Sequence, residues 1–296
     1  MIDLHVHTNL SDGTDTIPQL LQKVEEKGLS AFTITDHDNI LGNRIIEEKY
    51  LSLLAEKGID FVRGVELSTD FFGQYMHLLV FGFDLNNPVL ENIINQINNS
   101  RLKRIEARVG VLENEFQIHL TDEEKQWLYS QNNPAKMHIA NILVNKGIAE
   151  NIDSAFDKYL YHKFPKTKLD GRMVAKTLSD AGMTVGIAHP LGGNKERRLS
   201  AVEFEEKVKV MKDYGIKFLE CYYSLYNEKE RELIKSVAHK YGMKLSGGSD
   251  YHGKNKTVEL GDLGIGYQPR IDDLTVLNIV EYTHNIDTWS KVNDSN

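Results

Sequence analysis

Hydrophobic residues form short runs that end in polar or charged residues, and most runs are followed by a stretch with helical spacing. This alternation is typical of βα units around a parallel sheet. The segment TIPQLLQKVEEKG, for example, predicts a helix with Pro18 in its first turn and Gly28 after its end. The runs predict seven strands, at Ile2 to His5, Ala31 to Thr35, Phe61 to Val65, Met76 to Phe81, Thr184 to Ala188, Phe218 to Tyr222 and Lys244 to Gly247.

The strand pattern stops after Phe83 and resumes about a hundred residues later. The segment LENIINQINNSRLKRIEARVGVLENEF carries Leu, Ile and Val at three- and four-residue steps, which predicts a long helix. GRMVAKTLSDAG then predicts a helix that leads into the fifth strand. We therefore expect a catalytic α/β domain formed by residues 1–98 and 169–296, with a small helical subdomain inserted at 99–168.

Composition restricts the class of protein. The 296 residues are 41% hydrophobic, which is enough for a substantial core, and the net charge of −8 disfavours general attraction of polyanions. The single Cys221 excludes an internal disulfide framework. Because the sequence has no cationic leader and no long apolar run, we expect a soluble cytoplasmic protein with no membrane contact, and no obligate protein partner is indicated.

Histidines and carboxylates recur at the predicted strand ends. They are His5, His7, His37, Glu66, His189, Asp250 and His252. The carboxyl ends of the strands in a βα barrel share one face, so these side chains are expected to converge there. His77 does not fit this expectation, because it falls at the start of its predicted strand. Burying many unpaired polar groups costs about 1 to 3 kcal/mol each, and divalent cations would satisfy them together.

The motifs HVHTNLSDG, ITDHD, GVELS, IAHP and GSDYH, in this order, resemble those of the PHP family, named for polymerase and histidinol phosphatase. The resemblance implies a distorted (βα)7 TIM-like barrel with a trinuclear metal centre. It also implies that Glu66 bridges two ions. By resemblance, one ion is held by His5, His7, Glu66 and Asp250, a second by Glu66, His77 and His189, and a third by Asp12, His37 and His252.

These ligands combine imidazole and carboxylate without sulfur, which suits two or three divalent cations of Mn²⁺, Zn²⁺ or Fe²⁺. Paired ions would lower the pKa of a bridging water and supply hydroxide at neutral pH, so the predicted reaction is phosphoester hydrolysis. We expect the residues with catalytic roles to be Glu66, Asp250, His189 and His138.

The inserted helices supply candidate substrate-binding residues, namely Arg101, Arg104, Lys136 and His138. Cations there could bind phosphate, although a solvated helix face is an equally good interpretation of the Arg101 to Arg108 run. The RLKR segment and Lys136-Met137-His138 resemble the subgroup that contains ribonuclease AM and nucleoside 3',5'-bisphosphate phosphatases. Lys136 and Asn141 stand where that subgroup has arginines. The expected substrate is a small phosphorylated molecule, either a 3',5'-bisphosphate or short 5'-phosphorylated RNA.

Three further interpretations stay open. The chain could be a histidinol phosphate phosphatase, although the SDG motif and the insertion argue against it. It could be a non-catalytic metal-binding PHP domain, although none of the nine expected ligands is missing. Tyr222, Tyr223 and Tyr226, which follow the sixth strand, could stack on a base or could be packing residues.

Overall fold

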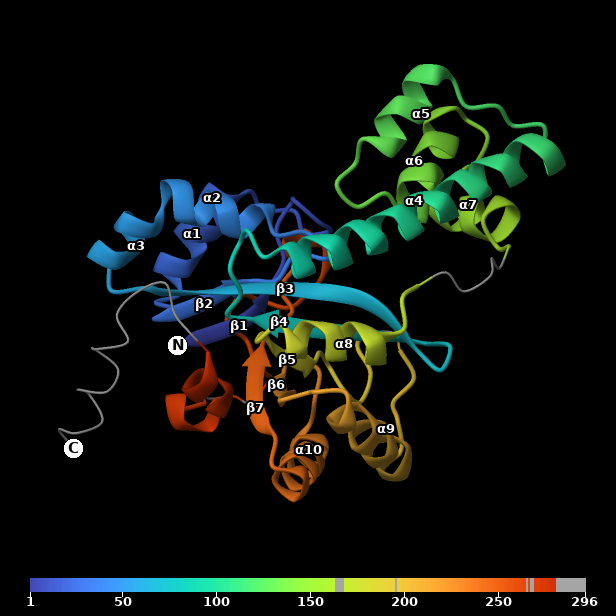
Figure 1. The fold of residues 1–296 in the computed structure, drawn as a ribbon. Coiled ribbons are helices and arrows are strands. Elements are labelled where there is room, and N and C mark those ends of the chain that lie inside the picture. Colours follow the sequence, from blue (N-terminus) through green and yellow to red (C-terminus); the bar gives the residue numbers. More distant parts are fainter. Residues whose placement is uncertain (163–167, 195, 265, 267–268, 281–296) are drawn as a thin grey trace.

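The computed structural model describes residues 1–162, 168–194, 196–264, 266 and 269–280. All seven predicted strands are present (Figure 1): β1 Ile2–Val6, β2 Ala31–Ile34, β3 Asp60–Phe71, β4 Gln74–Phe81, β5 Thr184–Ile187, β6 Phe218–Tyr223 and β7 Lys244–Gly248. The helices are α1 Ile17–Glu26, α2 Leu41–Lys49, α3 Leu51–Glu56, α4 Pro88–Glu115, α5 Asp122–Tyr129, α6 Lys136–Asn145, α7 Ile152–Tyr159, α8 Gly171–Asp180, α9 Ala201–Asp213 and α10 Glu228–Tyr241. Short 3₁₀ helices follow β7, at Gly253–Asn255, Ile271–Asp273 and Thr275–Ile279.

The seven strands form one sheet in sequence order, and it curves into the predicted distorted barrel. The expectation of a parallel sheet is wrong at one strand, because β4 runs antiparallel to both β3 and β5. A two-residue turn joins β3 to β4, and both of its residues, Phe72 and Gly73, have positive φ of 47° and 83°. Such turns match the twist of paired strands and give tight hairpins.

The reversed strand explains the position of His77. Since β4 runs against its neighbours, its start lies at the same face as the ends of the parallel strands, and His77 pairs with Ser68 of β3. The prediction that Glu66 ends its strand is also wrong, because β3 continues to Phe71 and Glu66 lies inside it. His37, beyond the end of β2, forms a parallel bridge with Glu66.

The barrel closes between β1 and the segment that follows β7. The backbone N–H of Asp250 donates to His5 O at 2.8 Å, and that of His7 donates to Tyr251 O at 2.9 Å. The fully buried carboxylate of Asp3 accepts from the backbone and hydroxyl of Ser249, at 2.9 and 2.6 Å. These bonds hold the first and last metal-ligand candidates side by side.

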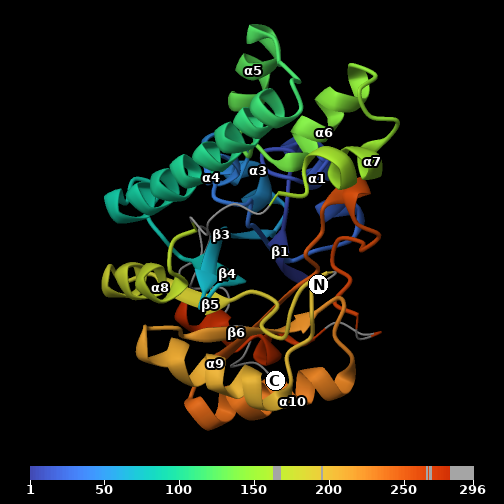
Figure 2. The same ribbon diagram turned by 90° about the vertical axis from the view of Figure 1, so that its right-hand side faces the viewer.

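The helix α4 is continuous across the expected boundary at residue 99 and contacts two hydrophobic clusters. Its first half packs on the main core through Leu90, Ile93, Ile94 and Ile97. Its second half packs with α5, α6 and α7 through Ile105, Val109 and Leu112. Figure 2 shows these three helices gathered at one end of the molecule, away from α9 and α10. Neither α4 nor any other helix in the described ranges is long and apolar enough to cross a membrane.

Candidate metal centre

The carboxylate of Glu66, which is 1% exposed, lies at the centre of a ring of imidazoles. Its Oε2 faces three ring nitrogens, those of His5 at 3.3 Å, His7 at 3.2 Å and His37 at 3.2 Å. Its Oε1 faces two more, those of His77 at 3.0 Å and His189 at 3.1 Å. Each of the two carboxylate oxygens therefore faces a different set of imidazoles, which is the arrangement that a bridging ligand needs.

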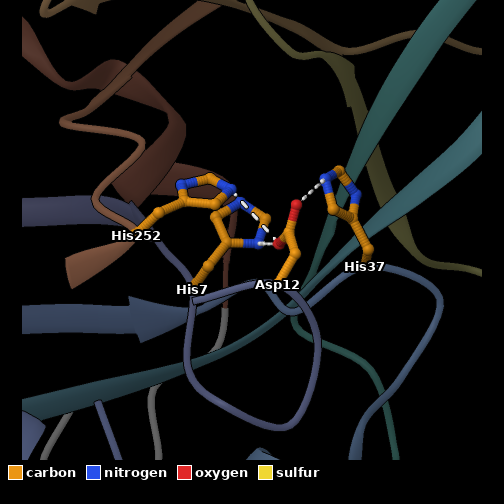
Figure 3. A group of neighbouring side chains, drawn as sticks. All are labelled: His7, Asp12, His37 and His252. Atoms are coloured by element: carbon orange, nitrogen blue, oxygen red, sulfur yellow. Dashed lines mark ion pairs between the residues drawn. The ribbon is translucent and has the colours of Figure 1, made fainter. Parts of the chain in front are cut away.

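Asp12 lies between three imidazoles in the loop after β1 (Figure 3). Its Oδ1 is 3.2 Å from His252 Nε2 and 3.6 Å from His7 Nδ1, while its Oδ2 is 3.7 Å from His37 Nε2. Asp12 is about half exposed, with a side-chain value of 49%, and it is the member of the cluster that solvent reaches most. The loop thus carries a second carboxylate that separates His37 from the His7 and His252 pair.

Asp250, directly after β7, is the third carboxylate of the cluster. Its Oδ1 lies 3.6 Å from His5 Nε2 and 3.4 Å from His7 Nε2. Its Oδ2 accepts from Tyr223 at 3.1 Å and from Lys256 at 2.6 Å. These two donors fix the carboxylate so that the other oxygen faces the imidazoles.

The three tyrosines at the end of β6 and just after it do not offer a surface for base stacking. Tyr222, Tyr223 and Tyr226 are 4%, 1% and 2% exposed, so the packing interpretation is confirmed. Tyr226 also accepts from the backbone N–H of Leu191 at 2.8 Å, which ties it to the loop that carries His189.

The structure brings all nine predicted ligands into one cluster, and eight of them fall in three groups whose donor atoms are close enough to share an ion. The groups are His5, His7 and Asp250; His37, Glu66 and His77; and His7, Asp12, His37 and His252. These groups differ in two ways from the sets that the family resemblance implies. His37 also groups with Glu66 and His77, and His7 also groups with Asp12. Glu66 lies within 3.3 Å of the first group, and His189 contacts Glu66 Oε1.

The donor set fits divalent cations. Among the described residues, the buried Nδ1 atoms of His7, His37 and His77 face carboxylate oxygens at 3.6, 3.2 and 3.0 Å but form no hydrogen bond with them. Buried polar atoms are nearly always satisfied, so three such nitrogens beside carboxylates fit a site that holds cations between them. Imidazole nitrogen and carboxylate oxygen without sulfur suit Mn²⁺, Zn²⁺ or Fe²⁺.

Burial and charge favour the metal-binding form of Glu66 and His37 but the protonated form of His7. Burial alone would raise the pKa of Glu66, but His37, His77 and His5 outweigh it and hold that pKa well below its usual range. Burial lowers the pKa of His37 to about 3, so His37 is a neutral imidazole at neutral pH. For His7, burial is outweighed by Asp250 and Glu66, which raise the pKa to about 9. A cation at His7 must therefore displace a proton.

Glu220 in β6 is a buried residue of this site that the sequence analysis did not identify. It is fully buried, and one oxygen lies 2.8 Å from His5 Nδ1 while the other accepts from the backbone N–H of His189 at 2.7 Å. With its Nδ1 bound to Glu220, His5 presents Nε2 to the cluster. The signal was present, because an acidic residue inside the apolar strand FLECYY needs a buried partner.

Three residues at the site have backbones in the left-handed region, where side chains are disfavoured. They are Asp38 at φ 52°, His189 at φ 30° and Asp250 at φ 59°. They follow β2, β5 and β7, so the chain turns sharply within a few residues of the end of each strand, at the edge of the cluster. Strained backbones of this kind cost about 1 to 3 kcal/mol and concentrate at functional sites.

The candidate substrate-binding residues divide into two groups. Arg101 of α4 reaches the barrel, where it pairs with Asp38, and Arg104 follows one turn later and hydrogen-bonds Ser100 at 3.3 Å. The contacts of Lys136 and His138 lie within the helical insertion. Lys136 donates to Leu160 O at 3.2 Å, and His138 Nδ1 accepts from the backbone N–H of Ala135 at 3.0 Å.

Comparison with known proteins identifies the family. The family model described as the PHP domain matches residues 3–168, which is more than half of the chain. The chain belongs to the PHP family. This PHP protein is 28% identical to the 5'-3' exoribonuclease of Haemophilus influenzae, over 88% of its own length and 92% of that relative. It is 26% identical to the 3',5'-nucleoside bisphosphate phosphatase of Chromobacterium violaceum, over 85% of its own length and 87% of that relative.

A solved structure supports the same assignment. A protein described as a metal-dependent phosphoesterase from Bifidobacterium adolescentis superimposes on the PHP chain with a TM-score of 0.73 and 26% identity, covering 94% of both chains. The PHP chain is therefore a metal-dependent phosphoesterase, a hydrolase that acts on phosphoric ester bonds.

Proposed function

We propose that this phosphoesterase hydrolyses phosphate esters of nucleotides, either small 3',5'-bisphosphates or short 5'-phosphorylated RNA. The observation that carries the proposal is the position of Arg101. This arginine, from the inserted part of the chain, reaches Asp38, the residue after the metal-ligand candidate His37. The names of the two relatives, an exoribonuclease and a nucleoside bisphosphate phosphatase, support the same substrate class.

In this proposal the nine clustered residues hold two or three divalent cations, shared as described for the three groups. Such ions activate water and neutralise the charge that develops on phosphorus. Glu66 contacts both sides of the centre through its two oxygens. Glu220 orients His5 and His189. Tyr223 orients Asp250.

We further propose that residues 99–168 form a substrate-capping subdomain. Its own hydrophobic cluster, which includes Leu112, Leu128 and Leu143, supports a unit that packs separately from the barrel core. In this scheme Arg101, which pairs with Asp38, binds the phosphate beside the metal centre, and Arg104 follows one turn later on α4. Lys136 and His138 would contact the substrate from within the insertion. Burial lowers the pKa of His138, which favours a neutral imidazole there.

The proposal is tested with Mn²⁺-loaded protein and four substrates: a nucleoside 3',5'-bisphosphate, a 5'-phosphorylated RNA oligomer, histidinol phosphate and an aryl phosphate. Initial rates are measured for each. A preference for the bisphosphate or the RNA is the expected result. Preferred turnover of histidinol phosphate would replace the proposed substrate, and inactivity on all four would favour a non-catalytic metal-binding domain.

The contribution of the cap is tested with Lys136→Ala. If Lys136 contacts bound substrate, KM for the preferred nucleotide rises with kcat unchanged, because a ground-state contact is lost. Lys146→Ala is the matched control, since Lys146 is on the same subdomain and pairs with Glu124 at 3.0 Å. A fall in kcat alone would contradict the role of Lys136 in substrate capture.

A further inference from the structure

A cavity of about 340 Å³ adjoins the metal centre, and two imidazoles of the cluster, His77 and His189, form part of its wall. The remaining wall comes from the start of β4, the loop after β5 and α9. Its other polar residues include Gln74, Tyr75, Glu196 and Lys207. A molecule bound at the metal centre can therefore extend into this cavity without crossing the protein.

Lys207 is the notable cation of the cavity. It is half-buried on α9, and its Nζ lies 5.9 Å from the centre of the Phe71 ring. It forms no salt bridge with any residue in the described part of the chain. Burial lowers the pKa of Lys207 to about 8 despite the opposing effect of Glu196, so the ammonium form still predominates at neutral pH. A partly desolvated ammonium that forms no salt bridge is unfavourable even with Glu196 nearby, and an anionic ligand would offset that cost.

The other charged groups near the cavity already have partners. Glu196 accepts from the backbone N–H of Gly193 at 2.7 Å and faces His189 Nδ1 at 4.0 Å. Arg197 pairs with Glu203 at 2.8 Å. Of the two basic residues in the cavity wall, Lys207 is therefore the one that forms no ion pair with a described residue.

We propose that this cavity binds a second phosphate of the substrate, held by Lys207 while the phosphate to be hydrolysed lies at the metal centre. The inference rests on the proposed nucleotide phosphoesterase function and adds a subsite to it. The second phosphate is either the other ester of a bisphosphate or the next internucleotide phosphate of RNA.

The space beyond Lys207 accommodates a longer substrate. A second cavity of about 500 Å³ shares Gln74, Leu199 and Lys207 with the first and continues along the β3–β4 hairpin. Phe72, at the tip of the hairpin, lines this cavity, is 66% exposed and has the Arg172 guanidinium 4.0 Å from its ring centre. Aromatic rings and arginine guanidinium groups are both surfaces on which unpaired bases stack.

The test uses Lys207→Met, which removes the charge and keeps a side chain of similar length. Steady-state kinetics of the metal-loaded enzyme are compared for adenosine 3',5'-bisphosphate, a 5'-phosphorylated RNA trinucleotide and adenosine 5'-monophosphate, which has only one phosphate. Lys212→Met is the matched control, because Lys212 is on the same helix and lies over Tyr241. Lys207→Arg keeps the charge and checks that any loss is electrostatic.

We expect Lys207→Met to raise KM for the bisphosphate or the trinucleotide by about 10- to 100-fold, with little change for the monophosphate. Lys207→Arg and Lys212→Met should keep the wild-type preference. An effect on the bisphosphate alone identifies a terminal phosphate, and an effect on the trinucleotide alone identifies an internucleotide phosphate.

Equal losses on all three substrates, or no loss on either substrate with a second phosphate, would overturn the subsite. If the wild type hydrolyses none of the three, the proposed function fails. The subsite is then tested by calorimetry with the bisphosphate and the monophosphate. Weaker binding of the bisphosphate alone to Lys207→Met supports it, and unchanged binding overturns it.

Discussion

At the scale of single residues, the site depends on buried carboxylates whose two oxygens have different partners. Glu66 faces imidazoles on both sides, and Glu220 joins His5 Nδ1 to the backbone of His189. The motifs in the sequence indicated Glu66, because GVELS lies among other metal-binding motifs. Glu220 has no such neighbour. Its place in the apolar strand FLECYY indicates a buried partner, but which partner follows only from the strand order that places β6 between β5 and β7.

Glu220→Gln tests the orienting role of this carboxylate. A glutamine cannot accept two hydrogen bonds at opposite ends, so either His5 or the buried N–H of His189 loses its acceptor. We expect a loss of about 1 to 3 kcal/mol in the free energy of unfolding and a roughly 10- to 100-fold loss in metal affinity. Urea unfolding and metal titration measure these changes.

The control is Glu232→Gln, which removes an exposed carboxylate that pairs with Lys235 on α10. It should change neither quantity appreciably, because surface pairs contribute little. Wild-type metal affinity in Glu220→Gln would show that Glu220 does not orient the ligands.

At the scale of elements, the sequence predicted where the strands lie but not the direction of β4. The hairpin turn is Phe72-Gly73, and phenylalanine at positive φ is not part of the Asn-Gly or Asp-Gly signal that usually marks such turns. The two hydrophobic runs that form β3 and β4 were therefore predicted to be separate parallel strands. The position of His77 was the one indication that a strand was reversed.

The close approach of β7 to β1 depends on Gly248. A methyl group there would lie 2.2 Å from His5 Cβ and 2.4 Å from His5 N. Gly248→Ala should therefore destabilise the fold by about 1 to 3 kcal/mol through overpacking and displace His5, with lower metal affinity. Thermal unfolding and metal titration check both effects.

Gly110→Ala is the matched control for this change. Gly110 lies inside α4, and an added Cβ meets nothing within 4 Å. Alanine should stabilise the helix there by about 0.5 to 1 kcal/mol. If Gly248→Ala were as stable as Gly110→Ala and bound metal normally, the tight closure would not be needed for the site.

A second link across the barrel seam joins Asp15, Lys23 of α1 and Tyr251. Lys23 Nζ donates to Asp15 at 2.7 Å, and Tyr251 Oη donates to the same carboxylate at 2.6 Å. Burial opposes the charged carboxylate, but these two bonds outweigh it and lower the pKa of Asp15. The folded pKa is then below the unfolded value, so the stabilisation is present above the unfolded pKa and is lost as the pH falls through the folded pKa.

Asp15→Asn should therefore lower the free energy of unfolding by about 1 kcal/mol at about pH 7, and by less as the pH falls below the unfolded pKa toward about pH 3, where protonation of the unfolded state removes part of the stabilisation. Urea unfolding in the presence of a chelator measures the difference. Asp180→Asn, which removes an exposed pair with Lys176, is the control. An effect of Asp15→Asn that is equal at both pH values would contradict this account of the seam.

At the scale of the whole molecule, sequence patterns were sufficient for the α/β class and for the nine residues that the structure brings together. The motifs succeeded because residues at the ends of parallel strands converge on one face. They could not predict the contacts of the insertion, since these depend on how α4 spans two hydrophobic clusters. Arg101 consequently reaches the barrel, while the contacts of Lys136 and His138 lie within the cap.

The central claim is that the residues around Glu66 hold divalent cations that the reaction requires. It is tested most directly by the initial rate of nucleoside 3',5'-bisphosphate hydrolysis as Mn²⁺ is added to chelated, folded protein, for the wild type and for Glu66→Gln. We predict no activity after chelation, recovery at two to three equivalents of metal in the wild type, and a rate lower by more than about 100-fold in Glu66→Gln. Full activity in the chelator, or an unchanged rate in Glu66→Gln, would contradict the claim.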